Sequence, residues 1–290
     1  MNLLENHPLA RYTTYQIGGP ADFFVEAQST QEVLEALAWA EERDMPVYVF
    51  GGGSNLLFDD EGFRGLVIRV RSQHFGVRGN ELQADAGVLM AKVVVAVADA
   101  GLTGLEEWNG LPGTVGGAVT GYAGCFGLES KDVLKEATVY VPGEGVKTVG
   151  PDWFEYRYRW SRLKAEPGVV LNAVFHLRAG DAAAIDEKMK AVARTRIQKQ
   201  PPGLSTGSFF KNPTGDHAGR LIEAAGLKGK CVGKICVSEA HANFFLNKGG
   251  ATSSDVLALA DEVQKEVFAQ FGVTLEREVV YVPSTVLYNG

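Results

Sequence analysis

A run of glycines that directly follows an apolar segment constrains this chain more than any other feature. Residues 47–50, Val-Tyr-Val-Phe, lead into a loop made of Gly51, Gly52, Gly53, Ser54, Asn55 and Leu56. Glycine adopts positive φ at little cost and lets backbone N–H groups approach a ligand closely, so the loop suits a nest for phosphate oxygens. A second apolar strand follows at residues 66–70 and no helix opens, unlike a Rossmann fingerprint or a Walker A loop. For this stretch alone, an ordinary glycine-rich turn is the alternative.

Two further glycine clusters favour a large, extended ligand that bears phosphate groups. One lies near the N-terminus, at residues 13–21. The other follows a helical segment and includes Pro112, Gly113, Thr114, Gly116, Gly117 and Ala118. Both offer many backbone donors with little side-chain bulk. This is the arrangement expected where a dinucleotide pyrophosphate lies across several loops of a mixed sheet.

Composition and charge argue against several classes of protein. The 290 residues leave room for one large or two modest domains. The net charge of −7, without any basic run, argues against a nucleic-acid surface. No apolar stretch reaches the length of a membrane span, and the N-terminus lacks the basic and apolar regions of a signal peptide. We therefore expect a cytoplasmic enzyme with no nucleic-acid or membrane partner, and a monomer, since no long apolar stripe calls for an obligate interface.

The cysteines and histidines give no sign of a metal site. Cys125, Cys231 and Cys236 are odd in number and carry no C-x-x-C spacing, so we expect neither a disulfide framework nor a zinc site. We predict that all three are buried structural thiols, with Cys125 nearest a ligand because it follows the second glycine cluster. His217 and His241 also lack the spacing of metal ligands.

The order of predicted elements is that of an α+β protein. A β-α-β unit comes first, in which Ser29 and Glu32 form a capping box for the helix. The turn at residues 200–203, Gln-Pro-Pro-Gly, marks the best domain boundary. We predict a first region at residues 1–199, split near residue 70 into two α+β subdomains, and a smaller α+β domain at residues 200–290. The expected elements of the first region are strands at 22–26, 47–50, 66–70, 137–141 and 169–178 and helices after Ser29, at 88–100 and at 182–198.

The smaller C-terminal unit is expected to mix short strands with two helices. Its last helix begins after Thr252, Ser253 or Ser254, with Asp255 adding favourable charge in the first turn. The other expected elements are a helix at 218–225, strands near 237 and at 243–246, and a final strand at 273–282.

Three segments combine reactive side chains with unusual backbone signals. Aromatics alternate with arginines at residues 156–161, which fits an exposed strand or an arginine held as a two-point fork for a carboxylate or phosphate. Ser208 follows a glycine and could be a turn residue; the absence of a Gly-x-Ser-x-Gly elbow argues against a hydrolase nucleophile. On a strand at residues 275–279, Glu276 and Glu278 share one face, and periodicity does not choose between them.

Eight segments together resemble, in their order along the chain, the UDP-N-acetylenolpyruvoylglucosamine reductase family, flavoenzymes that complete UDP-N-acetylmuramic acid for bacterial peptidoglycan. They are Thr13–Ala21, Gly51–Leu57, Gly110–Ala118, Tyr158–Lys164, Gly207–Pro213, Leu221–Gly229, Val237–Asn247 and Leu275–Val279. The resemblance implies an FAD-binding domain of the vanillyl-alcohol-oxidase type followed by a smaller substrate domain. The short interval between Arg159 and Ser208 resembles the compact subtype, which lacks an extra tyrosine-bearing loop. Tyr122 departs from the family pattern, which usually has asparagine there, and this puts a flavin contact in doubt.

The resemblance also implies the reaction. FAD and NADPH are the expected cofactors, and UDP-N-acetylglucosamine enolpyruvate is the expected substrate. Arg159 is expected to supply positive charge at the substrate carboxylate. Glu278 is expected to hydrogen-bond the intermediate, and Ser208 to deliver a proton to the adjacent carbon.

Further contacts follow from the same resemblance. Tyr158, Lys199 and Asn212 are the expected substrate contacts. The residues named above in the loops at 51–56 and 112–118 are the expected FAD contacts, and no metal is expected. The alternative is another FAD-dependent oxidase or dehydrogenase of the same fold, which would not need the three expected catalytic residues together.

Overall fold

The computed structural model describes residues 1–285 of the chain. Its N-terminal part contains a four-stranded sheet with the spatial order β1-β2-β5-β3. β1 pairs with β2 in antiparallel fashion, and β2 and β3 both pair with β5 in parallel. The strands are β1 (Leu4–Pro8), β2 (Pro20–Ala27), β3 (Val47–Phe50) and β5 (Phe63–Val70).

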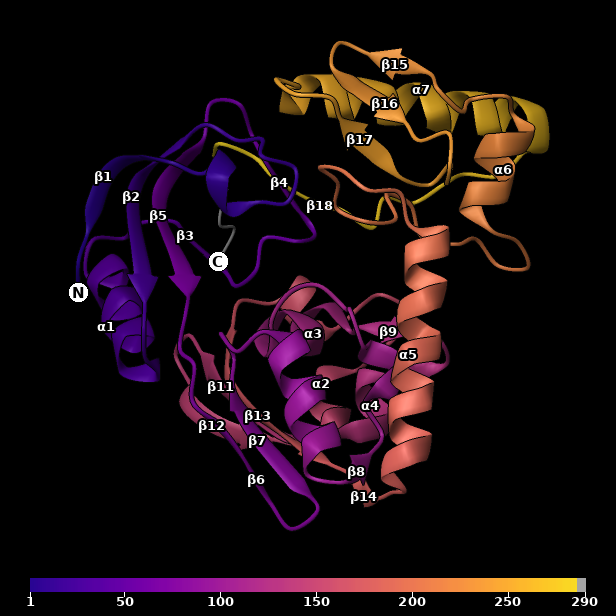
Figure 1. The fold of residues 1–290 in the computed structure, drawn as a ribbon. Helices are drawn as coiled ribbons and strands as arrows, with labels where there is room; N and C mark the ends of the chain where they lie inside the picture. Colours follow the sequence, from indigo (N-terminus) through magenta and orange to yellow (C-terminus); the bar gives the residue numbers. More distant parts are fainter. Residues whose placement is uncertain (286–290) are drawn as a thin grey trace.

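Helix α1 (Thr30–Glu41) covers one face of this sheet (Figure 1). It begins after Ser29, whose hydroxyl accepts a hydrogen bond of 3.2 Å from the backbone N–H of Glu32. The Glu32 carboxylate accepts a hydrogen bond from the backbone N–H of Gln28, the residue before Ser29. The predicted N-cap is therefore confirmed, but the reciprocal bond of the capping box is made by Gln28 and not by Ser29. Side chains of β2 and β5 alternate between the α1 face and the opposite face, as the pleat of a strand requires.

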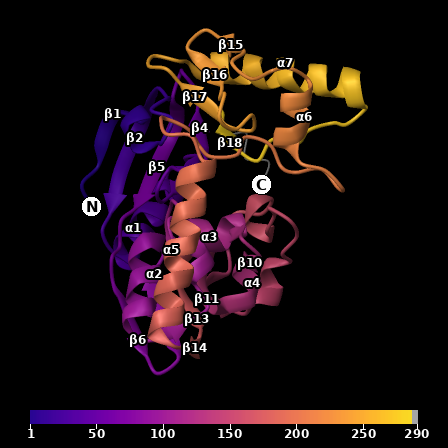
Figure 2. The same cartoon turned by 45° about the vertical axis from the view of Figure 1, so that its right-hand side comes forward.

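A five-stranded antiparallel sheet forms the middle of the chain, with the order β12-β11-β13-β7-β6. Helices α2 (Met90–Asp99) and α3 (Val115–Gly121) pack against it, and the long helix α5 (Ala182–Lys199) lies beside α2 (Figures 1 and 2). The strands are β6 (Phe75–Arg78), β7 (Glu81–Asp85), β11 (Leu134–Val141), β12 (Gly145–Val149) and β13 (Val169–His176).

Short elements complete this region. They are β8 (Leu102–Thr103), which pairs with β14 (Arg178–Ala179), the hairpin β9 (Gly124–Cys125) and β10 (Leu128–Glu129), helix α4 (Ser130–Val133), and the 3₁₀ turns η1 (Ala10–Tyr12), η2 (Glu106–Trp108), η3 (Pro151–Phe154) and η4 (Arg162–Lys164).

The C-terminal part packs a three-stranded sheet, β15-β16-β17, against helix α7 (Ser253–Phe271). Thr252 caps α7 as expected: its hydroxyl accepts from the N–H of Asp255, and the Asp255 carboxylate accepts from the N–H of Thr252. The remaining elements are α6 (Ala218–Ala224), β15 (Cys231–Val232), β16 (Ile235–Val237) and β17 (Phe245–Asn247).

The final strand is much shorter than the sequence suggests. Only β18 (Val280–Val282) is a strand, and it pairs in parallel with β4 (Leu56–Phe58), directly after the first glycine loop (Figure 1). The predicted strand at 273–282 is therefore wrong over residues 273–279. Helix α7 ends at Gly272 with φ 66°, and the backbone then runs irregularly between two neighbours. One neighbour is the segment around Phe210, which bridges to Arg277, and the other is β4.

The prediction for the cysteines is also wrong in part. Cys231 and Cys236 form a disulfide bond, because they stand directly opposite each other in the β15–β16 hairpin. Gly233 makes this tight turn possible with φ 52°. Cys231 is exposed, whereas Cys125 is a free, half-buried thiol.

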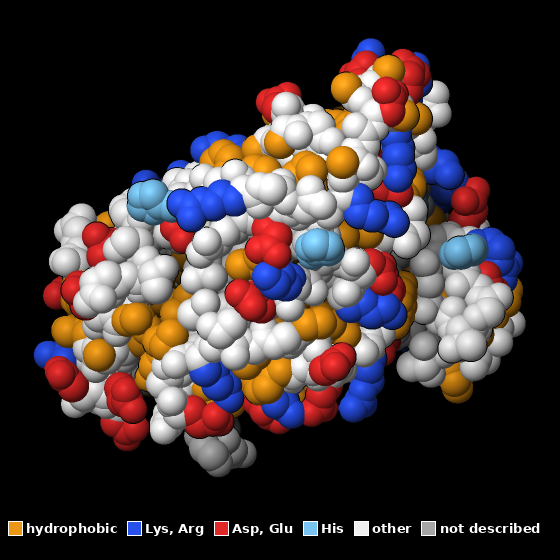
Figure 3. All heavy atoms as spheres, turned by 90° about the horizontal axis from the view of Figure 1, so that it is seen from below, with side chains coloured by type: hydrophobic (Ala, Val, Ile, Leu, Met, Phe, Trp, Pro, Cys, Tyr) orange, Lys and Arg blue, Asp and Glu red, His pale blue; other side chains and the backbone are white. Residues whose placement is uncertain are grey.

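The described surface carries charges of both signs. Seen from below, Lys and Arg side chains are interspersed with Asp and Glu side chains (Figure 3). Among residues 1–285, no helix has both the length and the apolar character needed to cross a bilayer.

Candidate active site

The first glycine loop packs tightly against the second glycine cluster. A Cβ atom on Gly51 would lie 2.2 Å from Oγ1 of Thr114, and one on Gly52 would lie 2.9 Å from the Cα of Gly113. The backbone of Gly51 therefore packs against the Thr114 side chain, and that of Gly52 packs against the backbone of Gly113, so a larger residue at either position would force a neighbour to shift. Segments that lie far apart in the sequence thus form one surface.

The start of the N-terminal glycine cluster joins the same surface. Gly53 has φ 65°, and a Cβ there would lie 2.1 Å from the carbonyl oxygen of Tyr12. The N–H of Thr14 donates a hydrogen bond of 3.1 Å to the carbonyl of Gly53. This N-terminal segment therefore closes the other side of the first loop.

The first loop presents a row of backbone donors. Within residues 1–285, the N–H groups of Gly51, Gly52, Gly53, Ser54 and Asn55 donate to no other group. Successive backbone N–H groups without a protein partner can form a nest for an anion, so this row suits a ligand with several acceptor oxygens. The pyrophosphate of a dinucleotide fits this nest.

The second cluster contributes differently. The N–H groups of Gly116 and Ala118 bond to Ala86 and Thr114, and that of Gly117 lies 3.4 Å from the Thr114 hydroxyl. These donors start helix α3, for which Thr114 is the N-cap. The cluster thus supplies close packing for the first loop more than free donors of its own.

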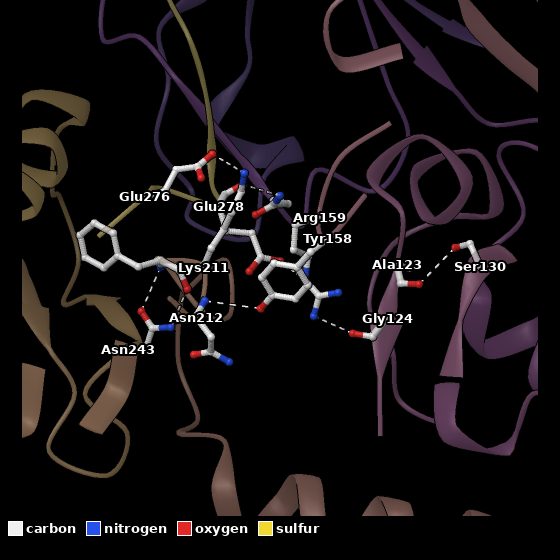
Figure 4. A network of polar contacts seen from close by, with 12 residues as sticks. Ala123, Gly124, Ser130, Tyr158, Arg159, Lys211, Asn212, Asn243, Glu276 and Glu278 are labelled. Atoms are coloured by element: carbon white, nitrogen blue, oxygen red, sulfur yellow. Dashed lines mark hydrogen bonds and ion pairs between the residues drawn. The ribbon is translucent and has the colours of Figure 1, made fainter. Parts of the chain in front are cut away.

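Arg159 lies at the tip of a tight turn beside the half-buried Glu278. The turn is closed by reciprocal backbone bonds of 3.1 and 2.8 Å between Arg157 and Trp160, so the expected exposed strand at 156–161 is a turn instead. Nε of Arg159 lies 2.8 Å from Oε1 of Glu278, and Nη2 donates a hydrogen bond of 2.6 Å to the carbonyl of Gly124 (Figure 4). The guanidinium is therefore fixed from two sides.

Glu278, not Glu276, is the protected carboxyl group. The Glu278 side chain is 19% exposed, compared with 72% for Glu276, which pairs with Lys211. Burial raises the pKa of Glu278 above its usual value, against the opposing effects of Arg159 and Lys164. This carboxyl group therefore stays protonated over a wider pH range than an exposed glutamate.

Ser208 lies next to the segment that carries Glu278. It follows Gly207, which has φ 81°, and its backbone bridges to Phe244. The N–H of Glu278 donates a hydrogen bond of 2.8 Å to the carbonyl of Phe209, the next residue. The Ser208 hydroxyl makes no hydrogen bond with the described part of the chain, so it is free to donate to a ligand.

The expected substrate contacts are Tyr158, Asn212 and Lys199. Tyr158 is 47% exposed, and its hydroxyl accepts a long bond of 3.4 Å from the N–H of Asn212 (Figure 4). The Asn212 side chain accepts from the N–H of Ala218 at the start of α6. Lys199 is the exposed last residue of α5 and forms no ion pair within residues 1–285, and its charge helps to lower the pKa of His241. The structure thus brings Tyr158 and Asn212 into contact.

Three residues at this site were not predicted from the sequence. Lys164 donates from its ammonium group to the carbonyl of Arg159, and Lys211 pairs with Glu276. Asn243 is buried and exchanges two hydrogen bonds with the backbone of Phe210, which fixes the segment after Ser208. All three lie in segments that resemble the family, but nothing in their spacing reveals these contacts.

Tyr122 serves a local structural purpose. It ends helix α3 in the left-handed conformation, with φ 51°, where asparagine is a favoured residue. Its buried ring stacks on Tyr156 at 4.3 Å, and its hydroxyl donates to Glu129. In this chain the tyrosine is therefore held by ring packing and by a hydrogen bond from its hydroxyl.

Comparisons with known proteins agree with this geometry. Residues 21–150 match a family model described as an FAD binding domain. Residues 198–282 match the C-terminal domain of UDP-N-acetylenolpyruvoylglucosamine reductase. Among curated proteins, the reductase of Rubrobacter xylanophilus is 46% identical and the alignment covers 94% of this chain and 93% of that protein. The enzyme of Chloroflexus aurantiacus is 41% identical, with 96% and 97% covered.

A solved structure shows the same fold. The crystal structure of UDP-N-acetylenolpyruvylglucosamine reductase from Thermus caldophilus superposes with a TM-score of 0.84 at 36% identity, covering 97% of this chain and 98% of that one. The FAD-binding domain and the fold define the chain as a flavin-dependent oxidoreductase, which confirms the expected fold class. The chain belongs to the UDP-N-acetylenolpyruvoylglucosamine reductase family.

Proposed function

We propose that this chain uses NADPH to reduce UDP-N-acetylglucosamine enolpyruvate to UDP-N-acetylmuramate, a step of peptidoglycan precursor synthesis that serves cell-wall growth and division. Membership of the reductase family supports the reaction. The observation that carries the residue assignment is the 2.8 Å contact between Nε of Arg159 and Oε1 of the half-buried Glu278. It lies next to the segment of Ser208, whose hydroxyl makes no hydrogen bond within residues 1–285.

The first glycine loop would hold FAD. Its five backbone donors, which have no partner in the described part of the chain, suit the pyrophosphate, and Thr114 and Gly113 would support the loop from behind. The remaining proposed contacts are Leu56, Pro112, Gly116, Gly117 and Ala118. The chemistry that FAD supplies when bound is the transfer of two electrons as hydride from NADPH to the substrate.

Arg159 would bind the substrate carboxylate. Addition of hydride to the vinyl CH₂ carbon places negative charge on the neighbouring carbon and, through conjugation, on the carboxylate oxygens. A guanidinium has five N–H donors, and the contacts with Glu278 and Gly124 use only part of them. The rest can form a planar, two-point contact with the carboxylate and stabilise the growing charge.

Glu278 would donate a hydrogen bond to the intermediate, and Ser208 would donate a proton to it. A protonated Glu278 can donate a hydrogen bond to the charged intermediate, and burial favours that form. Ser208 would donate its hydroxyl proton to the carbon that becomes the lactyl stereocentre. A serine is a weak acid, so this transfer requires a strongly basic carbon held at close range. Tyr158, Lys199 and Asn212 would bind the remainder of the substrate.

An anaerobic experiment tests the function. The purified protein should be yellow, NADPH should bleach it, and UDP-N-acetylglucosamine enolpyruvate should restore the colour while UDP-N-acetylmuramate forms. Flavin that is bleached by NADPH but not reoxidised by this substrate would contradict the proposal and favour another FAD-dependent oxidase or dehydrogenase.

We also propose that the chain acts as a cytoplasmic monomer. The proposed domains are residues 1–199, which would bind FAD and divide near residue 70, and residues 200–290, which would bind substrate. The separate sheets at 4–70 and 75–176 and the end of α5 at Lys199 support these boundaries. Size-exclusion chromatography with light scattering tests the oligomeric state, and a dimer would contradict it.

A further inference from the structure

The backbone of Arg159 adopts a conformation that its residue type disfavours. Its φ is 56°, in the left-handed region where turns normally place glycine or asparagine. Arg159 occupies the third position of the turn from Arg157 to Trp160, with Tyr158 before it. Such strain persists only when surrounding contacts over-determine it. The contacts around Arg159 therefore decide where its guanidinium points.

Lys164 makes the contact that acts on this strained backbone. Its Nζ donates a hydrogen bond of 2.7 Å to the carbonyl oxygen of Arg159. The chain folds back between the two residues because Ser161 is fully buried and its hydroxyl donates to the carbonyl of Thr120 in α3. The turn η4, which ends at Lys164, is thus anchored on a rigid helix and presents the ammonium group to Arg159.

The position of Lys164 is electrostatically unfavourable. Lys164 as a whole is exposed, but partial desolvation of its ammonium group lowers its pKa, and the nearby positive charges of Lys211 and Arg159 lower it further. Glu278 and Glu276 oppose this effect only in part. The ammonium group therefore lies among two cations and two carboxyl groups, and its hydrogen bond is made with the carbonyl of Arg159.

We propose that Lys164 is a positioning residue for substrate reduction, because its ammonium group holds the left-handed backbone of Arg159 and so aims the guanidinium at the substrate carboxylate. This inference rests on the proposed function of Arg159. It assigns Lys164 an action through Arg159, with no direct contact to the reacting atoms.

Two variants of Lys164 separate the hydrogen bond from the bulk of the side chain. Lys164→Met keeps a long stem and removes the donor, whereas Lys164→Arg keeps a positively charged donor. Loss of a charged hydrogen bond predicts that Lys164→Met slows reoxidation of the reduced flavin by the enolpyruvyl substrate about 10- to 100-fold. Lys164→Arg should recover part of this rate. Lys135→Met, which removes an exposed lysine paired with Glu81 on the central sheet, is the matched control.

A double-mutant cycle with Arg159→Lys tests whether Lys164 acts through Arg159. The first readout is the single-turnover rate of flavin reoxidation. The second is the Kd of the enolpyruvyl substrate for the oxidised enzyme, which requires no turnover. In the Arg159→Lys background, Lys164→Met should change either quantity by no more than about twofold, since coupled residues are strongly non-additive.

Each alternative outcome overturns the inference. If the two substitutions change the reoxidation rate or the Kd by independent factors that multiply in the double variant, Lys164 acts on the substrate directly and not through Arg159. If Lys164→Met leaves both quantities unchanged, Lys164 is a surface lysine without a role in the reaction. If Lys164→Met fails to fold, Lys164→Gln takes its place in the same cycle. A wild-type enzyme that neither binds nor reduces the enolpyruvyl substrate would instead contradict the proposed function itself.

Discussion

The side-chain amide of Asn55 donates a hydrogen bond of 3.1 Å to the backbone carbonyl of Glu278. Asn55 ends the row of free donors in the first glycine loop, and Glu278 pairs with Arg159. The N–H of Val280 returns a bond of 3.1 Å to the carbonyl of Asn55, just before β18 joins β4. The loop proposed to hold FAD and the carboxyl group proposed to serve the substrate are therefore one connected structure.

Asn55→Ala should weaken FAD binding and slow substrate reduction at the same time. Removing the amide leaves the Glu278 carbonyl without this donor, which costs about 1–3 kcal/mol of folding stability when the group is buried. We expect a lower Tm, faster loss of FAD on dilution and slower substrate reduction. Gln73→Ala, which removes a side-chain donor to the carbonyls of Ser72 and Gly87, serves as a control. Loss of stability without any change in FAD release would contradict the connection.

Gly52→Ala should weaken FAD binding strongly. The added methyl group would lie 2.9 Å from the Cα of Gly113, so one of the two loops must move. Gly76→Ala is a matched control, because a Cβ there meets nothing within 4 Å. The FAD content of the purified variants, measured from flavin absorbance after acid precipitation, checks this prediction. Full FAD occupancy in Gly52→Ala would show that the loops do not form the nest.

The raised pKa of Glu278 predicts how stability changes with pH. The unfolded chain releases this proton near the ordinary value of 4.5, whereas the folded chain retains it to higher pH. Protonated Glu278 therefore contributes stability that is fully present below pH 4.5 and is lost as the pH rises through the folded pKa.

Glu278→Gln removes this contribution. The Tm of the wild type relative to that of Glu278→Gln should fall as the pH is raised from 4 to 8, because the wild type loses the contribution of its protonated carboxyl group. Scanning fluorimetry at several pH values measures the difference. A difference that grows in favour of the wild type with rising pH would show that the pairing with Arg159 outweighs burial.

The sequence predicted local structure better than long-range contacts. Ser29 and Thr252 cap their helices because capping depends on neighbours within one turn. β6 and β12 were missed because their residues are exposed or half-buried, without a clear apolar face. The disulfide between Cys231 and Cys236 was missed because it depends on hairpin register, which spacing alone does not fix.

At the site, too, local features were predicted from the sequence and long-range contacts were not. The glycine loop at residues 51–55 was recognisable because the required conformations and close contacts select glycine directly. Glu276 and Glu278 are equivalent in a strand pattern, and only the contacts with Lys211 and Arg159 distinguish them. Lys164 had no sequence signal of its own, because its partner is a backbone carbonyl.

Ser208→Ala tests the central claim most directly, because it separates the two halves of the reaction. Stopped-flow absorbance should show that NADPH reduces the flavin at nearly the wild-type rate. Reoxidation by the enolpyruvyl substrate should slow by roughly 10²–10⁴-fold, the contribution of a positioned acid. Ser205→Ala, in the same segment, should leave both rates unchanged. Equal slowing of both halves in Ser208→Ala, or no slowing of reoxidation, would contradict the role of Ser208 as proton donor.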